Sequence, residues 1–235
     1  MKIITLNMEG DKHTDEVILL QNQETASVLC LQEIKKSTFD AFFGDLGLQG
    51  FFAPMTSYEG DESEGQQWGV AILSDLPCFL LGIDYYENFS ADYPEMAATR
   101  NERPRAVLLT VSVRDRGSSF TIATTHFTWT TNGETSEEQR VNLASLLLLL
   151  DKYPSLVLTG DFNAPRGTEI HQRLSGRFQD ILPNSIESTL DLILHRSGLK
   201  LVVDGIFVTE DVSAKGVHLV SGVSDHCAIV ADVRI

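Results

Sequence analysis

The sequence of 235 residues has few basic residues and a large excess of acidic ones. Lys and Arg together number 18, against 33 Asp and Glu, so the formal net charge is −15. A surface of that sign repels polyanions at long range, and non-specific duplex binding depends mostly on Lys and Arg. The composition therefore excludes a generic DNA-coating protein, although a local patch or a bound cation can still hold one phosphate.

Cysteine is also sparse. Cys30, Cys78 and Cys227 are an odd number, and their spacing fits no zinc motif. Cys30 and Cys227 lie in or next to apolar runs, where free cysteines usually pack as small hydrophobic side chains. No disulfide framework is indicated, which favours a reducing compartment.

Long hydrophobic runs are absent. The longest strongly apolar run, Leu146 to Leu150, is far too short to span a bilayer, and the segment Met1 to Met8 reads as a strand without the apolar centre of a signal peptide. There is no internal repeat and no Gly/Ser linker. We therefore expect a cytoplasmic protein without a transmembrane segment, with residues 1–235 forming a single domain.

The pattern along the chain predicts an α/β fold. Two β-rich segments near the start, Lys2–Met8 and Ser27–Ile34, are separated by an expected helix over Thr14–Ala26. Later segments read mainly as strands, with a helix from a capping box at Thr135–Glu138 to about Leu150. Two packed sheets with helices outside satisfy this order. We also expect Trp68–Ser74 and Cys78–Ile83 to pair as a hairpin.

Polar side chains collect where the predicted strands end. Strand ends on a rigid sheet are common positions for binding and catalytic groups. We expect these residues to line one cleft at the same edge of the two sheets: Asn7, Glu33, His126, Asp161, Asn163, Asp204, Asp225 and His226.

Each of these residues also has a purely structural interpretation. A carboxylate inside an apolar strand, such as Glu33, is costly unless it is ion-paired or bound to a metal, and both alternatives stay open. Asp161 and Asn163 follow the strand LVLTG, so they fit either an Asx turn or a general base beside a phosphate-binding amide. Asp204, in the apolar run VVDGIFV, is expected to pair with a histidine.

The ordered set resembles a known family. The segments are ITLN, LCLQEIK, WGVAILS, TTHFTW, LTGDFNAP, VDGIFVT and GVSDHCAIVADV, and they resemble the motifs of the endonuclease/exonuclease/phosphatase family with the DNase I-like fold. The resemblance extends from Ile3 to Val233. It implies a four-layer α/β sandwich with two central, mostly antiparallel sheets flanked by helices. It also implies Mg²⁺ or Mn²⁺ as cofactor and hydrolysis of a phosphoester.

The resemblance assigns roles residue by residue. Glu33 matches the principal metal ligand, with Asn7 and Asp225 nearby. Oxygen ligands of this kind suit magnesium, which keeps several waters. Glu9, two residues after Asn7, is either a further outer ligand or a solvated acid.

The remaining matched residues are catalytic in the family. Asp161 matches the acid that activates water, and Asn163 matches the amide that binds phosphate. His226 matches the histidine on the scissile phosphate, and Asp204 matches the acid that orients it. His126 resembles the second histidine of the DNase, sphingomyelinase and lipid phosphatase branches, but the sequence indicates no carboxylate partner for it.

Two residues and one segment are expected to bind substrate. Arg105 lies where many members of the family have a basic residue. Trp129 follows His126 by three positions, so its indole fits either stacking on a substrate or packing in the core. The long segment Asp84–Pro104 is expected to flank the cleft and shape substrate choice.

These observations leave three functional hypotheses. The first is a metal-dependent phosphoesterase acting on a phosphodiester or phosphomonoester, such as a small molecule or a lipid headgroup, with no obligatory protein partner. The alternative is a DNA endonuclease or exonuclease of the same family, which needs a basic strip near the site. The third is a catalytically silent binding module, which the complete residue set disfavours. The candidates for the basic strip are Arg100, Arg103, Arg105 and Arg166.

Overall fold

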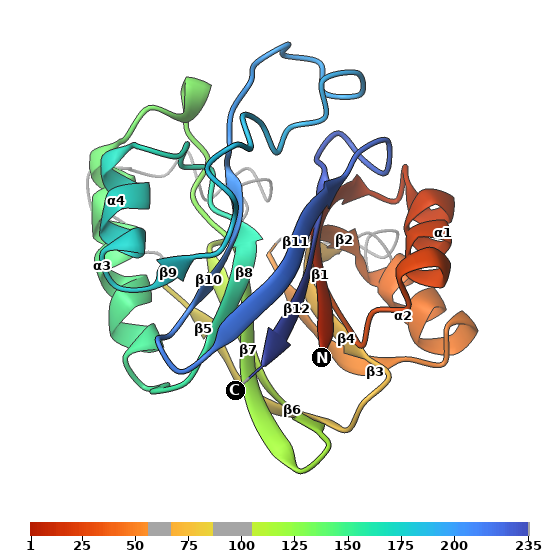
Figure 1. The fold of residues 1–235 in the computed structure, drawn as a ribbon. Coiled ribbons are helices and arrows are strands. Elements are labelled where there is room, and N and C mark those ends of the chain that lie inside the picture. The colour runs from red at the N-terminus through yellow and green to blue at the C-terminus, as the bar shows by residue number, and fades with distance from the viewer. Residues whose placement is uncertain (56–66, 87–104, 235) are drawn as a thin grey trace.

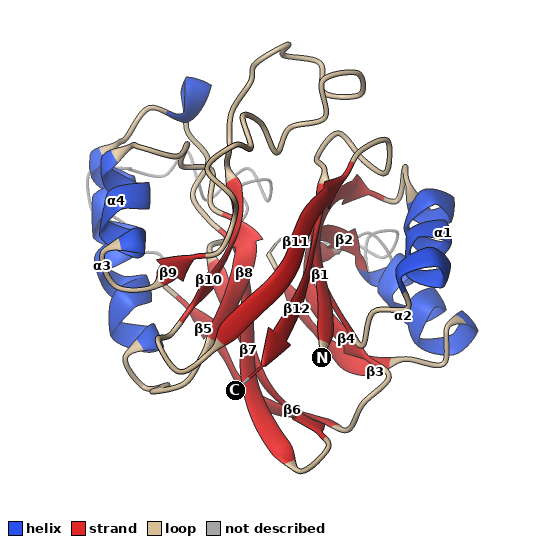
Figure 2. Cartoon of the chain, in the orientation of Figure 1, coloured by secondary structure: helices blue, strands red, loops and turns tan. Residues whose placement is uncertain are grey.

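Two six-stranded β-sheets pack face to face, and helices cover their outer faces (Figure 1). The computed structural model describes residues 1–55, 67–86 and 105–234. Figure 2 shows helices on the two outer sides and strands in the middle. The predicted α/β sandwich of DNase I-like form is therefore confirmed.

The first sheet has the strand order β11-β12-β1-β2-β4-β3 and contains both ends of the described chain. Its ladders are antiparallel except for β1–β2. Helices α1 (Thr14–Glu24) and α2 (Lys36–Asp45) cover its outer face. The strands are β1 (Lys2–Gly10), β2 (Val28–Lys35), β3 (Gln49–Pro54), β4 (Trp68–Ser74), β11 (Ser213–Val220) and β12 (Ala228–Arg234).

The second sheet has the strand order β5-β6-β7-β8-β10-β9, and its ladders are antiparallel except for β7–β8. Helices α3 (Glu137–Leu150) and α4 (Glu169–Ser175) cover its outer face, and a short 3₁₀ turn spans Thr131–Gly133. The strands are β5 (Cys78–Tyr85), β6 (Val107–Asp115), β7 (Ser118–His126), β8 (Val157–Asp161), β9 (Gln179–Asp180) and β10 (Asp204–Val208).

The near-continuous apolar strands reflect burial on both faces. Ile3 of β1 belongs to the core between the two sheets, whereas the next residue, Ile4, packs in the core beneath α1 and α2. Successive side chains of a strand point to opposite faces, so a strand between two cores needs apolar residues at every position. The third core lies beneath α3 and α4, where Leu143 and Leu146 are fully buried.

Two predictions about local structure are wrong. Trp68–Ser74 and Cys78–Ile83 do not form a hairpin, because β4 pairs with β2 and β3 in the first sheet while β5 pairs with β6 in the second. The short connection before Cys78 carries the chain from one sheet to the other. At the start of α3 the N-cap is Ser136, one residue later than predicted, and its side chain accepts from the Gln139 backbone N–H.

Among the described residues, no helix has both the length and the apolar character needed to cross a membrane. Of the segment Asp84–Pro104, which we expected to flank the cleft, residues 87–104 lie outside the described residues.

Candidate active site

Matching bulges in two neighbouring strands bring Glu33 into the site. The parallel register of β1 and β2 shifts between Asn7 and Gly10, and the antiparallel register of β2 and β4 shifts between Leu31 and Ile34. Glu33 lies inside this irregular stretch with φ 54°, a left-handed backbone that is uncommon for a residue with a side chain. A bulge re-aims a side chain, and here it directs the carboxylate toward the second sheet.

The Glu33 carboxylate contacts side chains from both sheets. Its Oε1 atom lies 3.1 Å from Nε2 of His126 on β7 and accepts a hydrogen bond of 3.0 Å from the amide of Asn7. Burial raises the pKa of Glu33, but the hydrogen bonds and charge of His126 and the Asn7 amide outweigh burial and lower this pKa to about 2. Glu33 is therefore ionised at neutral pH, and it is the carboxylate partner of His126 that the sequence did not reveal.

Three neighbouring strands of the second sheet place polar residues at the same level. Asp161 at the end of β8 is in register with His126 of β7 on one side and with Asp204 of β10 on the other. The preceding residue, Gly160, has no room for a side chain, because a Cβ there would lie 2.1 Å from the carbonyl oxygen of Thr125. The convergence of these three side chains is thus a direct consequence of strand register.

The two carboxylate oxygens of Asp161 have different surroundings. Oδ1 accepts a hydrogen bond of 2.9 Å from the Asn163 backbone N–H, which makes the predicted Asx turn. Oδ2 accepts from the Asn7 amide at 3.1 Å and lies 3.5 Å from Nε2 of His126 and 3.9 Å from Nε2 of His226. One oxygen therefore holds the turn, while the other faces the polar cluster.

Asn163 adopts a left-handed backbone with φ 48°, which Asn tolerates better than most residues. Its side-chain amide donates to the Phe127 carbonyl at 2.9 Å and lies 3.5 Å from Nε2 of His126. The Asx turn and the polar amide at the cleft, which we treated as alternatives, therefore occur together.

Asp204 and His226 form the hydrogen-bonded pair that the sequence predicted. Nδ1 of His226 lies 2.8 Å and 3.0 Å from the two Asp204 oxygens, and both side chains are buried. Burial lowers the pKa of His226, but the charge of Asp204 more than offsets burial and raises this pKa to about 10. Because Nδ1 is occupied by Asp204, Nε2 is the nitrogen that faces Asp161.

The predicted metal ligands differ in what they present to the site. The amide nitrogen of Asn7 faces Glu33 and Asp161, whereas its oxygen accepts from the Glu9 backbone N–H at 3.1 Å. Burial raises the pKa of Asp225, and the charges of Glu9 and Glu33 also raise it. Glu9 itself contacts Lys12 and His13. In this arrangement the Asn7 amide nitrogen orients the carboxylates of Glu33 and Asp161, and its oxygen is bonded to the backbone instead of being directed at a metal site.

The candidate site contains a cleft of about 530 Å³. Asn7 and Asp204 lie behind the residues that line the cleft. Asn7 donates to Glu33 and Asp161, and Asp204 pairs with His226. Six of the eight strand-end residues therefore line one cleft as expected, whereas Asn7 and Asp204 do not line it and only contact residues that do. The predicted residues that line the cleft itself are Glu33, His126, Trp129, Asp161, Asn163, Asp225 and His226.

The two residues expected to bind substrate have different outcomes. Trp129 lines the cleft and is 68% exposed, which excludes the core alternative for its indole. In the described part of the chain Arg105 is not among the residues that line the cleft, so substrate binding by Arg105 stays a prediction. Its guanidinium lies over the Tyr85 ring, 3.7 Å from the centroid, and its backbone N–H donates to Met55.

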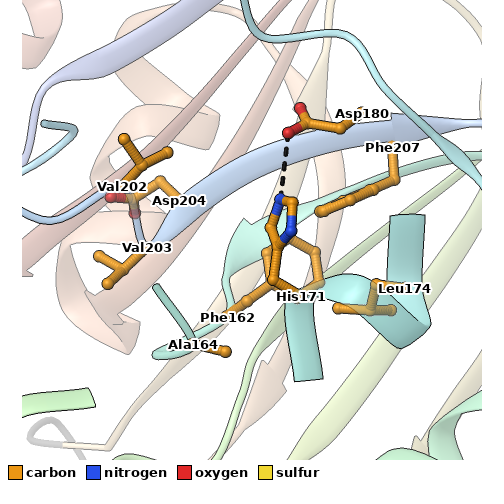
Figure 3. A pocket seen from close by; sticks show the side chains of 9 residues that line it. All are labelled: Phe162, Ala164, His171, Leu174, Asp180, Val202, Val203, Asp204 and Phe207. Atoms are coloured by element: carbon orange, nitrogen blue, oxygen red, sulfur yellow. Dashed lines mark hydrogen bonds and ion pairs between the residues drawn. The ribbon is translucent and has the colours of Figure 1, made fainter. Parts of the chain in front are cut away.

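A second, much smaller pocket lies behind Asp204 (Figure 3). Figure 3 shows His171 directed toward Asp180, and the His171 Nε2 atom lies 3.2 Å from the carboxylate. The pocket volume of about 10 Å³ admits at most one water, so it is part of the protein interior and not a substrate site.

Sequence reasoning missed several residues of the cleft wall, among them Trp68 and His195. Trp68 at the start of β4 lines the cleft, with its ring 6.4 Å from that of His126 at 71°. His195 lines the cleft from the loop before β10. Neither follows a predicted strand end, which was the signal used to choose candidates.

Similarity to known proteins agrees with this geometry. The profile of the Endonuclease/Exonuclease/phosphatase family matches residues 4–226. A search of curated proteins found no match.

Solved structures share the fold at low sequence identity. The human Nocturnin catalytic domain is 18% identical with a TM-score of 0.72, and the alignment covers 100% of this chain and 93% of that one. ANGEL2, described as a 2′,3′-cyclic phosphatase, is 14% identical with a TM-score of 0.75 and coverage of 100% and 95%. TDP2 from D. rerio, solved with a single-stranded DNA product, is 15% identical with a TM-score of 0.71 and coverage of 100% and 99%. The match over residues 4–226, together with the fold, shows that the chain belongs to the endonuclease/exonuclease/phosphatase family of phosphoester hydrolases.

Proposed function

We propose that this protein is a divalent-metal-dependent phosphoesterase that hydrolyses a phosphodiester or phosphomonoester with water. The observation that carries the proposal is the arrangement of Asp161. One of its oxygens is fixed by Asn163, and the other faces His226 and His126 across the cleft. A carboxylate held in this way can orient a water and accept its proton.

Protein groups at the cleft can carry out the proton transfer and the hydrogen bonding of the proposed reaction. The oxygen of a water attacks phosphorus, the water loses a proton to Asp161, and the bond between phosphorus and the ester oxygen breaks. His226, protonated because of Asp204, donates from Nε2 to a phosphoryl oxygen where negative charge develops. The departing oxygen leaves as an alkoxide that takes up a proton from solvent, and Asp161 releases to solvent the proton that it accepted, which completes the hydrolysis.

His126 contributes positive charge to the same region. Burial lowers its pKa, but the hydrogen bond with Glu33 and the charges of Asp161 and Glu33 raise it. The His126 ring lies 3.1 Å from Glu33, which is partly exposed, and 3.5 Å from the buried Asp161, so it holds these two acids together. The Asn163 amide beside it is a neutral donor for a phosphoryl oxygen.

The donor set fits Mg²⁺ or Mn²⁺. Glu33 and Asp225 offer carboxylate oxygens, the ligands that these hard cations prefer. Burial raises the pKa of Asp225, the charges of Glu9 and Glu33 raise it further, and a bound cation would offset that repulsion. We therefore assign Glu33 and Asp225 as the residues that would hold the metal, with Asn7 orienting Glu33. When bound, the cation would neutralise charge on the phosphoryl oxygens and on the leaving group.

A small phosphoester is favoured over duplex DNA as substrate. Of the arginines considered for a basic strip, Arg105 stacks on Tyr85, and Arg166 donates to Asp180 at 3.0 Å. In the described residues, the cleft wall contains neither Lys nor Arg. With a net charge of −15, the protein has little means to neutralise many phosphates at once.

The test is a metal-dependent substrate panel. Purified protein is assayed with Mg²⁺, with Mn²⁺ and after chelation, on bis-p-nitrophenyl phosphate, p-nitrophenyl phosphate, sphingomyelin, inositol phosphates, plasmid DNA and an abasic oligonucleotide. We expect metal-dependent hydrolysis of a small or lipid ester and little of duplex DNA.

Asp161→Asn is the active-site control for the panel, and we expect it to lose activity by about 10²- to 10⁴-fold. Cleavage of DNA in preference to every small ester would favour the nuclease alternative. Metal-independent activity, or activity retained by Asp161→Asn, would contradict the proposal. Binding of ligands without any turnover would favour the silent module.

A further inference from the structure

The loop before β10 brings an additional histidine to the cleft. His195 belongs to the segment between Leu190 and Leu201, which projects beyond the ends of the sheets in Figure 1. Its side chain lines the same cleft as Asp225 and His226. None of the roles proposed above uses this residue.

This loop is tied to the segment that carries the catalytic histidine. Leu190 forms a β-bridge with His226, and the backbone N–H of Asp191 donates to the Asp225 carbonyl at 2.8 Å. The Asp191 carboxylate accepts from the backbone N–H groups of Ile193 and Leu194 at 2.9 Å and from Gly222 at 2.7 Å. His195 is thus held at a defined position relative to the site.

Hydrogen bonds within the loop define which nitrogen of His195 carries the proton. The Ser197 hydroxyl oxygen accepts from the Leu199 backbone N–H at 3.1 Å, and the hydroxyl lies 2.8 Å from Nδ1 of His195. The Ser197 backbone N–H also points to Nδ1, at 3.4 Å. Both Ser197 groups can donate, so Nδ1 is an acceptor and the neutral ring carries its proton on Nε2.

The position of this imidazole suits an anionic oxygen. The His195 ring lies 6.0 Å from the His226 ring at 80°, and ligand atoms of His195, His226 and Asp225 all lie within 4.8 Å of one another. A ligand oxygen near His226 is therefore also near His195. Two imidazole N–H groups at an angle to each other can bind one phosphoryl group from two sides.

We propose that His195 is a further substrate-binding residue, which donates its Nε2–H to an anionic oxygen of the phosphoester. The inference rests on the proposed function for the identity of the substrate, but the contact itself is with phosphate. The loop from Leu190 to Leu201 is then a recognition element on the side of the cleft next to His226. The competing interpretation is a solvated turn residue whose ring only bonds to Ser197.

The kinetic test compares two substitutions at one position. His195→Ala removes the donor, whereas His195→Gln keeps an amide N–H near the place of Nε2. We expect His195→Ala to lower kcat/KM about tenfold to a hundredfold, mainly through KM, as for the loss of one hydrogen bond to a charged group. His195→Gln should recover most of the loss. His218→Ala on β11, whose imidazole is half exposed beside Glu24, is the matched control and should leave kcat/KM unchanged.

A binding test separates this inference from the proposed function. Inorganic phosphate is titrated into the wild-type protein while the histidine ring signals are followed by NMR at fixed pH, with and without Mg²⁺. We expect the His195 and His226 signals to shift together with one Kd, and His195→Ala to weaken that Kd about tenfold. His195 signals that stay fixed while those of His226 shift, or a folded His195→Ala with wild-type Kd and kcat/KM, would overturn the inference. Lack of turnover on every ester would refute the proposed function, and the phosphate titration would still decide the role of His195.

Discussion

Nδ1 of His226 lies 2.8 Å from one carboxylate oxygen of Asp204 and 3.0 Å from the other, and both residues are buried in the described structure. Since Asp204 is in register with Asp161, the same strand ladder sets the spacing between the pair and the proposed base. A buried carboxylate is costly without a partner, and the imidazolium supplies one. The pair therefore stabilises the fold and fixes the charge and orientation of His226.

Asp204→Asn should lower the pKa of His226 from about 10, because the neutral amide no longer stabilises the imidazolium. Activity should fall by about a hundredfold or more, most strongly at neutral and higher pH, where His226 in the variant loses its proton. The measurement is an NMR titration of His226 in metal-free protein beside a pH profile of kcat/KM. An unchanged titration would mean that Asp204 has only a structural role.

The same shift predicts how stability depends on pH. The folded-state pKa of His226 is raised, so its contribution is fully present below the unfolded pKa and is lost as pH rises through the folded value of about 10. The stability difference between wild type and Asp204→Asn should therefore narrow as pH increases above neutrality. Denaturant unfolding at several pH values measures it, and a difference that widens toward pH 10 would contradict the assignment.

Much of the site could be predicted from the sequence, because most of its residues directly follow apolar strands. Asp161 and His126 end β8 and β7, and parallel pairing of these strands puts the two residues in register. A lone carboxylate in an apolar run needs a partner, so Asp204 could be assigned a histidine, and the resemblance to the family identified that histidine as His226. The local sequence pattern is therefore sufficient to predict a site residue when that residue lies at the end of its own strand.

The rest depends on how separate elements pack. The contact of Glu33 with His126 joins two sheets and needs a bulge with φ 54° at Glu33, which no residue type at that position specifies. His195 is placed by the anchoring of its loop through Asp191, a long-range contact with Gly222. Arg105 was expected at the site by analogy, but the Tyr85 ring offers its guanidinium a stacking partner.

Glu33→Gln should remove most metal-dependent activity and weaken binding of Mg²⁺ while the protein stays folded. The Gln side chain has nearly the same shape, and its carbonyl oxygen can still accept from His126 and Asn7. It lacks the charge that holds a hard cation. Isothermal titration calorimetry with Mg²⁺ and thermal unfolding test both parts. Glu169→Gln, at an exposed ion pair with Arg140, is the control. Wild-type activity of Glu33→Gln at low Mg²⁺ would remove Glu33 from the metal site.

Trp129→Ala should reduce kcat/KM for the true substrate without a matching loss of stability. The indole is 68% exposed on the wall of the cleft, so its removal costs little packing, within about 0.5 kcal/mol of unfolding free energy. Trp129→Phe, which keeps an aromatic face, should retain more activity than the alanine variant. If the alanine variant unfolds more easily yet has wild-type kcat/KM, Trp129 serves the fold and not the substrate.

Asn163→Gly isolates the function of the amide from that of the turn. The Asn163 backbone has φ 48° and its N–H donates to Asp161 at 2.9 Å, and both features survive in glycine, which accepts a left-handed conformation without strain. The variant loses only the side-chain amide, which donates to Phe127 and lies near His126. We expect kcat/KM to fall by about tenfold to a hundredfold, while the unfolding midpoint changes little. Asn163→Ala should lose the same activity but be about 1–2 kcal/mol less stable than Asn163→Gly, because its Cβ is strained at this backbone angle and glycine has none. Steady-state kinetics and denaturant unfolding of both variants decide the matter: if Asn163→Gly keeps wild-type kcat/KM, the amide serves only its hydrogen bond to Phe127 and does not bind phosphate.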